Sequence, residues 1–168
     1  YLQSAGEADN KLKIDLCEIT TIRMLIVPHA GYIYSGNTAA FAYQYLHQLK
    51  NKIRRVILLG PAHRFRLTGA ALPGVDGFQT PLGLITLDSE LMEKILDDYS
   101  WINVIDQAHA EEHSLEVQLP FLKETLNEFK IVPIVVGDTD SELLAQMILK
   151  HSEDDQTLIV ISTDLSHY

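Results

Sequence analysis

Short apolar runs rich in β-branched residues recur along this chain, and three of them are followed within a few residues by a histidine. The runs cover residues 23–28, 56–61 and 158–164, and the histidines are His29, His63 and His167. Runs that are apolar throughout are typical of strands buried on both faces, as in parallel sheets. The carboxyl ends of parallel strands meet at one edge, where open α/β proteins bind their ligands. The three histidines therefore predict a shared site, most simply a metal site.

Helical patterns alternate with these runs, and the alternation predicts the fold class. Strands are expected at 23–28, 54–60, 69–72, 84–87, 102–105, 131–136 and 157–162. Helices are expected at 37–50, 88–99, 114–126 and 141–150, with a tyrosine-rich turn at 31–36 and a kink or a helix start at Pro120. This order predicts an α/β fold: a three-layer sandwich around a largely parallel or mixed central sheet.

Composition limits the class of protein and its partners. A chain of 168 residues that is 46% hydrophobic can bury the core of a single α/β domain, residues 1–168. The net charge of −10 would repel a nucleic-acid backbone, so no nucleic-acid partner is expected. No apolar stretch is long enough to cross a bilayer, so no membrane partner is expected either. The single cysteine, Cys17, fits the reducing cytoplasm, which is the expected location.

The two ends of the sequence suggest part of a longer protein. The first residue is Tyr1 rather than methionine, and the last, Tyr168, directly follows the third histidine. A self-contained domain rarely stops at the edge that carries its own site. We therefore expect the longer protein to supply further residues of the site.

His29 and His63 are the residues expected to bind the metal. Each follows a proline, Pro28 or Pro61, within two positions, and proline stiffens the backbone that presents the imidazole. Neutral imidazole is the commonest side-chain ligand for zinc, iron, copper and nickel, and two on neighbouring strand ends can share one ion. The alternative for His29 is a loop histidine that donates to a backbone carbonyl.

Asp164 and His167 form the second part of the expected site. They are three residues apart, so on a helical turn they share a face. A carboxylate beside an imidazole fixes its tautomer and raises its basicity. The pair therefore predicts either a general base or a supported metal ligand, His167, oriented by Asp164. Ser166 lies outside any G-x-S-x-G sequence, so a serine hydrolase is not expected.

A second pattern, His109-Ala110-Glu111-Glu112-His113, matches the H-x-x-E-H sequence of inverted zinc peptidases. Such a site needs one continuous helix to bring both histidines to the ion. This pattern keeps a zinc-type hydrolase open as an alternative. In the strand-end site, Glu112 and His113 are expected instead to contact a metal ligand or the substrate, and Tyr32 is a further candidate for the pocket lining.

Four motifs in this order resemble those of the Memo family: VPHAGY at 27–32, GPAH at 60–63, EHSLE with QLPFL over 112–122, and STDLSHY at 162–168. The resemblance covers residues 23–168. It implies an α/β sandwich similar in fold to the class III extradiol dioxygenases. It also implies a site at the strand ends.

The resemblance further implies roles for individual residues. In those dioxygenases two histidines and a glutamate hold Fe(II), and another histidine acts as base. By motif, His29 and His63 match the two imidazole ligands and His167 matches the base. Memo-like proteins take their third ligand from a later segment, which places it beyond residue 168. The implied cofactor is one divalent or redox-active metal, with iron or copper favoured and zinc as the alternative.

Three hypotheses for function follow from the sequence. The first is a non-haem-metal oxidoreductase of the extradiol dioxygenase type, acting on a small-molecule substrate. The second is a non-catalytic binding or signalling module that holds a phosphorylated or carboxylate-bearing peptide in the same cleft. The third is the zinc-type hydrolase that uses His109 and His113.

Overall fold

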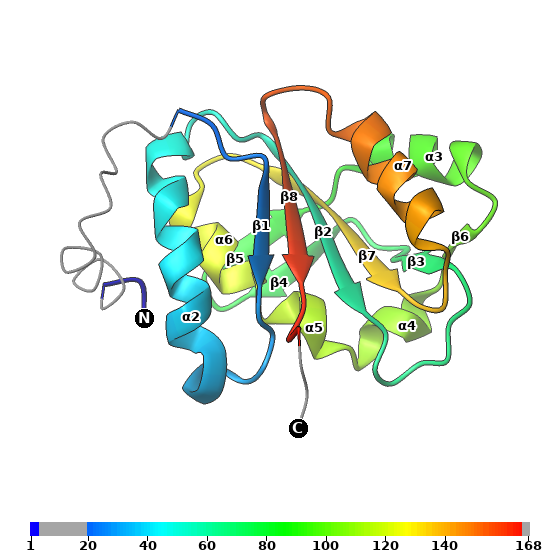
Figure 1. Ribbon diagram of the computed structural model, residues 1–168, viewed down its shortest axis with the longest axis horizontal. Coiled ribbons are helices and arrows are strands. Elements are labelled where there is room, and N and C mark those ends of the chain that lie inside the picture. Colours follow the sequence, from blue (N-terminus) through cyan, green and yellow to red (C-terminus); the bar gives the residue numbers. More distant parts are fainter. Residues whose placement is uncertain (4–19, 166–168) are drawn as a thin grey trace.

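A six-stranded mixed sheet with the order β1-β8-β2-β7-β3-β6 forms the centre of the computed structural model (Figure 1). The structure describes residues 1–3 and 20–165, so Cys17 and His167 lie outside the described residues. The strands are β1 (Met24–Val27), β2 (Arg55–Pro61), β3 (Ala70–Leu72), β6 (Ile102–Val104), β7 (Lys130–Val136) and β8 (Thr157–Ser162). All neighbouring pairs are parallel except β3 with β7. The expected α/β sandwich around a largely parallel or mixed sheet is confirmed.

The burial of each strand explains its sequence. Strands β2, β7 and β8 are buried along nearly their whole length, which is why they are apolar throughout. Strand β1 lies at the edge and alternates instead, with Leu25 and Val27 buried and Met24 and Ile26 exposed. The three central strands therefore hold the core, and β1 joins it through one face.

Helices flank the sheet on both faces. They are α2 (Tyr32–Tyr43), the 3-10 helix η2 (Gln44–Leu49), α3 (Ser89–Asp98), α4 (Asp106–Ala110), α5 (His113–Glu116), α6 (Leu119–Thr125) and α7 (Ser141–His151). In Figure 1, α5 and α6 lie behind the sheet and α7 lies in front of it. Helix α3 is joined to α7 by an ion pair between Asp98 and Lys150, 2.8 Å apart. Among the described residues, none of the helices has the length and apolar character that a bilayer span requires.

Helix α2 differs from the sequence expectation in where it begins. A turn was expected over 31–36 and a helix from Asn37, but the helix already begins at Tyr32, with Gly31 as its N-cap. The Tyr32 ring packs against Phe121 at 5.9 Å between centroids, and its hydroxyl donates to the Val117 carbonyl. These contacts with another element override the weak helix propensity of the tyrosines.

Two further elements refine the expected order. The strand expected at 84–87 does not join the central sheet; β5 (Gly83–Thr86) pairs with β4 (Gly77–Thr80) in a separate hairpin. Pro120 lies in the first turn of α6, so the helix begins there rather than bending. Proline fits this position because the first amides of a helix have no acceptor within it.

Candidate metal centre

The carboxyl ends of three neighbouring strands meet where the site was expected. Strands β1 and β2 both pair in parallel with β8, which lies between them. His29 follows the end of β1, and His63 follows the end of β2. The centroids of the two imidazole rings are 5.1 Å apart, with the planes nearly perpendicular. The fold therefore brings together two histidines that are far apart in the sequence.

A third imidazole, that of His113, joins the pair from the start of α5. Its ring stacks on that of His63 with 5.3 Å between centroids, and it lies 6.0 Å from that of His29. The His29 ring is buried, whereas the His113 side chain is 46% exposed. The cluster thus extends from the core to the surface, and one of its sides is open to a ligand.

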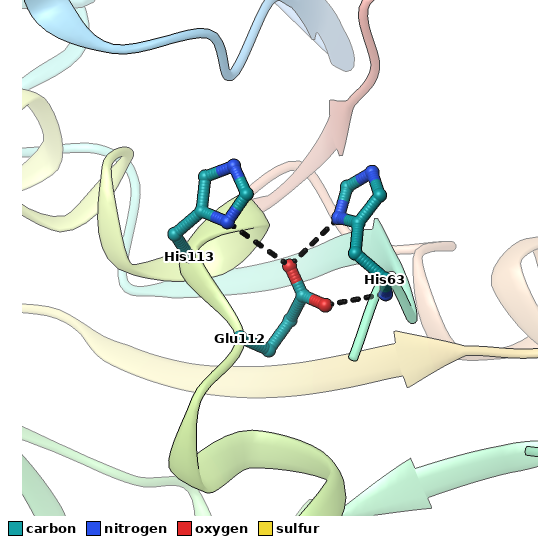
Figure 2. Close-up of side chains that lie close together, drawn as sticks. All are labelled: His63, Glu112 and His113. Atoms are coloured by element: carbon teal, nitrogen blue, oxygen red, sulfur yellow. Dashed lines mark hydrogen bonds and ion pairs between the residues drawn. The ribbon is translucent and has the colours of Figure 1, made fainter. Parts of the chain in front are cut away.

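The Glu112 carboxylate lies next to the Nδ1 atoms of two of these rings, those of His63 and His113. Glu112 is the N-cap of α5, and its carboxylate accepts hydrogen bonds from the amides of Ser114 (2.9 Å) and His63 (2.6 Å). It also accepts from His63 Nδ1 at 2.9 Å, and His113 Nδ1 lies 3.7 Å away (Figure 2). Burial raises the pKa of the Glu112 carboxyl, but the bonds from His63 and Ser114 outweigh it and lower the pKa to about 2. The carboxylate is therefore charged at neutral pH.

His63, Glu112 and His113 form a group that could hold a metal ion, with one ligand atom of each within 4.8 Å of the others. Figure 2 shows the second nitrogen of both imidazoles on the side away from Glu112. Since a carboxylate only accepts, His63 Nδ1 must carry a proton, which leaves Nε2 as the nitrogen that can bind a metal. The arrangement fits a metal bound by the Nε2 atoms, with Glu112 holding the rings in place.

The hydrogen bonds of Ser162 settle the tautomer of His29. The serine hydroxyl donates to the Ser114 carbonyl at 2.6 Å and accepts from Gln118 Nε2 at 2.8 Å. Its single proton is then used, so it can only accept from His29 Nδ1, which lies 3.2 Å away. His29 therefore carries its proton on Nδ1. Burial lowers the pKa of His29 despite the opposing charge of Asp164, which favours the neutral, metal-binding form.

Asp164 secures the loop that presents His29. One carboxylate oxygen accepts from the amides of His29 (2.7 Å) and Ala30 (3.1 Å), and the other lies 3.7 Å from His29 Nε2. The expected partner of Asp164, His167, lies outside the described residues, so the proposed base stays a prediction. What the structure shows is that Asp164 places a carboxylate beside His29.

The H-x-x-E-H pattern is not assembled as a zinc site. Helix α4 ends at Ala110 and α5 begins at His113, so the two histidines are not on one continuous helix. His109 Nε2 instead lies 3.0 Å from the Ala71 carbonyl oxygen, and burial lowers the pKa of His109. Within the described residues, His113 belongs to the group with His63, and His109 does not.

Tyr32 was expected to line the pocket of the site, but its ring packs against Phe121 and borders a different hollow with Pro120 and Phe121. Its hydroxyl donates to the Val117 carbonyl at 3.2 Å, and its ring is 38% exposed. Burial of the hydroxyl, with Glu116 nearby, raises the pKa of Tyr32. The phenol therefore stays protonated at neutral pH.

Gln118 and Ser162 are the residues that sequence reasoning missed. Gln118 is completely buried, and its amide donates to the Pro28 carbonyl at 2.9 Å as well as to Ser162. Its carbonyl accepts from the Tyr43 hydroxyl at 3.1 Å. The sequence signal was a glutamine directly beside the apolar stripe of residues 115, 119 and 122. A glutamine in that position is buried, and a buried amide needs hydrogen-bond partners.

Gly60 keeps β2 close to α5, and replacing it should loosen the site. A Cβ at this position would lie 2.7 Å from Leu115 Cδ2 and 2.8 Å from Ser114 Oγ. Gly60→Ala should therefore push α5 away from the strand that carries His63 and lower the free energy of unfolding by about 1–3 kcal/mol. Urea unfolding measures this. Gly31→Ala is the matched control, since its Cβ would meet only a Tyr34 side-chain atom at 3.8 Å; an equal loss in both variants would contradict the prediction.

Comparisons with known proteins place the chain among relatives of one kind. A family model described as Memo-like protein matches residues 3–168. A MEMO1 family protein of Aquifex aeolicus is 42% identical over 172 residues, which cover 95% of this chain and 61% of that protein. A MEMO1 family protein of Nitrosopumilus maritimus is 36% identical over 148 residues, covering 86% of this chain and 53% of that protein.

A third relative matches a comparable part of this chain. The Protein memo-1 homolog of Caenorhabditis elegans is 35% identical over 156 residues, which cover 89% of this chain and 44% of that protein. Across these three relatives the chain spans between 44% and 61% of their length.

Proposed function

The chain belongs to the Memo family, and we propose that it is a metal-dependent oxidoreductase whose metal is bound by His29, His63 and His113. One observation carries the proposal. The imidazole rings of His29, His63 and His113 come together with 5.1 to 6.0 Å between centroids, and the Nδ1 atoms of His29 and His63 each face a protein oxygen. Imidazole donors of this kind suit iron, copper and zinc, and the first two are redox-active.

The charges around the cluster support a divalent cation. Imidazole ligands add no charge to a bound metal ion, whereas Glu112 and Asp164 place two carboxylates beside the rings. Both carboxylates are held by backbone amides, so their positions are fixed before a cation binds. A buried or half-buried negative charge is costly unless it is compensated, and a cation at the Nε2 atoms would compensate both.

The proposed reaction is the oxidation of a small molecule, as the fold resemblance to the extradiol dioxygenases implies. A bound iron or copper ion would supply electron exchange with dioxygen and a chelating substrate. In this proposal Glu112 and Asp164 hold the imidazoles, and the exposed side of His113 borders the approach of the substrate. His167 would take or give the proton.

Metal analysis of the intact protein tests the metal centre. We expect near-stoichiometric iron or copper in the anaerobically purified wild type, and loss of this metal in His63→Ala and in His29→Ala. His109→Ala should retain the metal, because His109 is bonded to the Ala71 carbonyl instead. A wild type that takes up no metal after reconstitution would contradict the proposal. Metal lost from His109→Ala but kept by His29→Ala would place the site elsewhere.

Oxygen uptake tests the reaction separately from metal binding. With catechol as the chelating probe, the metal-loaded wild type should consume oxygen and His63→Ala should not. A protein that retains its metal and consumes no oxygen with catechol would contradict the dioxygenase assignment, and a peptide-binding role for the same cleft would then be preferred.

A further inference from the structure

A cavity lies at the amino ends of β2 and β7, at the end of these strands opposite to the histidines. It measures about 620 Å³, within the usual range of small-molecule sites. It is bordered by the first residues of β2 and β7, by β5, and by the residue that caps α3. The metal centre lies where β2 ends, so the two sites are separated by the length of this strand.

Positive charge gathers around this cavity although the protein as a whole is acidic. The chain has 13 lysines and arginines against 23 acidic residues, and four of the basic residues line this one cavity: Arg54, Arg55, Lys123 and Lys130. Three carboxylates line it too: Asp88, Glu90 and Glu128. Which charges are available to a ligand depends on how these groups pair.

Two of the carboxylates are already neutralised within the protein. Asp88 accepts from Arg55 Nε at 2.7 Å and from the Leu91 amide at 3.2 Å, so Asp88 and Arg55 compensate each other. Glu90 accepts from Lys94 Nζ at 2.8 Å. The pair of Asp88 and Arg55 is therefore structural, and the remaining charge of the cavity comes from the other three cations and one carboxylate, that of Glu128, which leaves an excess of positive charge.

Those three cations come from three separate segments of the chain and keep donors to spare. Lys123 Nζ donates one hydrogen bond, to the Leu84 carbonyl at 3.1 Å, and an ammonium group has three donors. Arg54 touches the Glu128 carboxylate only at 3.4 Å, and that side chain is 89% exposed. Lys130 is exposed at the start of β7. An anion in the cavity could therefore be reached by all three.

We propose that this cavity binds a small molecule that carries a phosphate group on an apolar body. Arg54, Lys123 and Lys130 would bind the phosphate, whose oxygens accept several charge-assisted hydrogen bonds at once. The apolar body would lie against Leu84 and Phe129, which also line the cavity. Because it lies at the other edge of the sheet, this site does not depend on the proposed metal centre.

Calorimetric titration of the intact protein with phenyl phosphate at low ionic strength tests the proposal. Lys123→Glu and Lys130→Glu should each weaken binding about tenfold or more, because each replaces an attractive charge with a repulsive one. Lys52→Glu is the control, since Lys52 pairs with Asp155 at 3.1 Å and does not line the cavity. Inorganic phosphate should bind more weakly than phenyl phosphate, because it lacks the apolar body.

Three results would overturn the proposal. One is the absence of saturable binding of phenyl phosphate to the wild type. Another is equal weakening in Lys52→Glu and in the two cavity variants, which would indicate only a general effect of net charge. The third is binding that survives in Lys123→Glu and Lys130→Glu but is lost in His63→Ala, which would place the phosphate at the histidine cluster. Thermal unfolding of each variant checks that the substitutions leave the fold intact.

Discussion

Glu112→Gln should lower the free energy of unfolding by about 3 kcal/mol at neutral pH, the largest stability effect we expect from a single carboxylate here. The figure follows from the lowering of the Glu112 pKa from 4.5 to about 2. Burial opposes this lowering, and the bonds from His63 and Ser114 produce it. Glutamine keeps the shape of the side chain but lacks the negative charge that accepts the hydrogen bonds from His63 and Ser114.

The same substitution should weaken metal binding about 10- to 100-fold, because Glu112 fixes the ring of His63 and the tautomer that leaves Nε2 for the metal. Metal titration of the folded protein measures this. Glu111→Gln is the control, since Glu111 is an exposed neighbour in the same loop. Equal metal affinity in wild type and Glu112→Gln would contradict the role given to the carboxylate.

The stability difference should also depend on pH in a defined direction. The folded pKa of Glu112 lies below its unfolded value, so the charged carboxylate stabilises the fold above about pH 4.5. This contribution is lost as the pH falls through about 2. Urea unfolding should therefore show a constant gap between wild type and Glu112→Gln near neutrality, which closes in acid. A gap that widens in acid would contradict this assignment.

Gln118→Leu should cost about 3–5 kcal/mol, because it leaves several buried polar groups without their partner. Gln118 is the common partner of the Pro28 carbonyl, the Ser162 hydroxyl and the Tyr43 hydroxyl. Burial raises the pKa of Tyr43 well above its usual value, so this hydroxyl keeps its proton and needs an acceptor. Leucine fills similar space but offers no acceptor and no donor.

The Gln118→Leu substitution should affect the proposed metal centre as well as the stability of the core. Without the amide of Gln118, the Ser162 hydroxyl is free to turn, and His29 is no longer confined to the tautomer with its proton on Nδ1. Urea unfolding and metal titration should both change in Gln118→Leu. Gln107→Leu, an exposed substitution on α4, should change neither. A variant that is destabilised but binds metal like the wild type would limit Gln118 to a role in the core.

The strand ends could be predicted from the sequence because each depends only on residues that are adjacent in the chain. Apolar runs of strand length reveal buried strands, and the residue that follows each run lies at the edge of the sheet. His29 and His63 were placed correctly at one edge for this reason. The alternation of strands and helices predicted a largely parallel sheet, but the strands that carry His29 and His63 were expected to be neighbours, and β8 lies between them.

The parts that the sequence did not reveal depend on contacts between distant elements. The Glu112 carboxylate meets the His63 amide only because α5 packs on the end of β2, where Gly60 leaves room for it. Gln118 belongs to an apolar stripe, and no local pattern tells which polar groups it will meet. The early start of α2 at Tyr32 likewise depends on packing against Phe121.

The position of β8 between β1 and β2 has a consequence for the order of events during synthesis. His29 and His63 are made early, yet their strands are not neighbours and are joined only through residues 157–162. A ribosome-bound chain that has not yet made β8 lacks the strand that joins β1 to β2, so the strand pairing that brings the two imidazoles together is not yet formed. In the proposed metal centre, His29 can therefore join His63 and His113 only after β8 has been made.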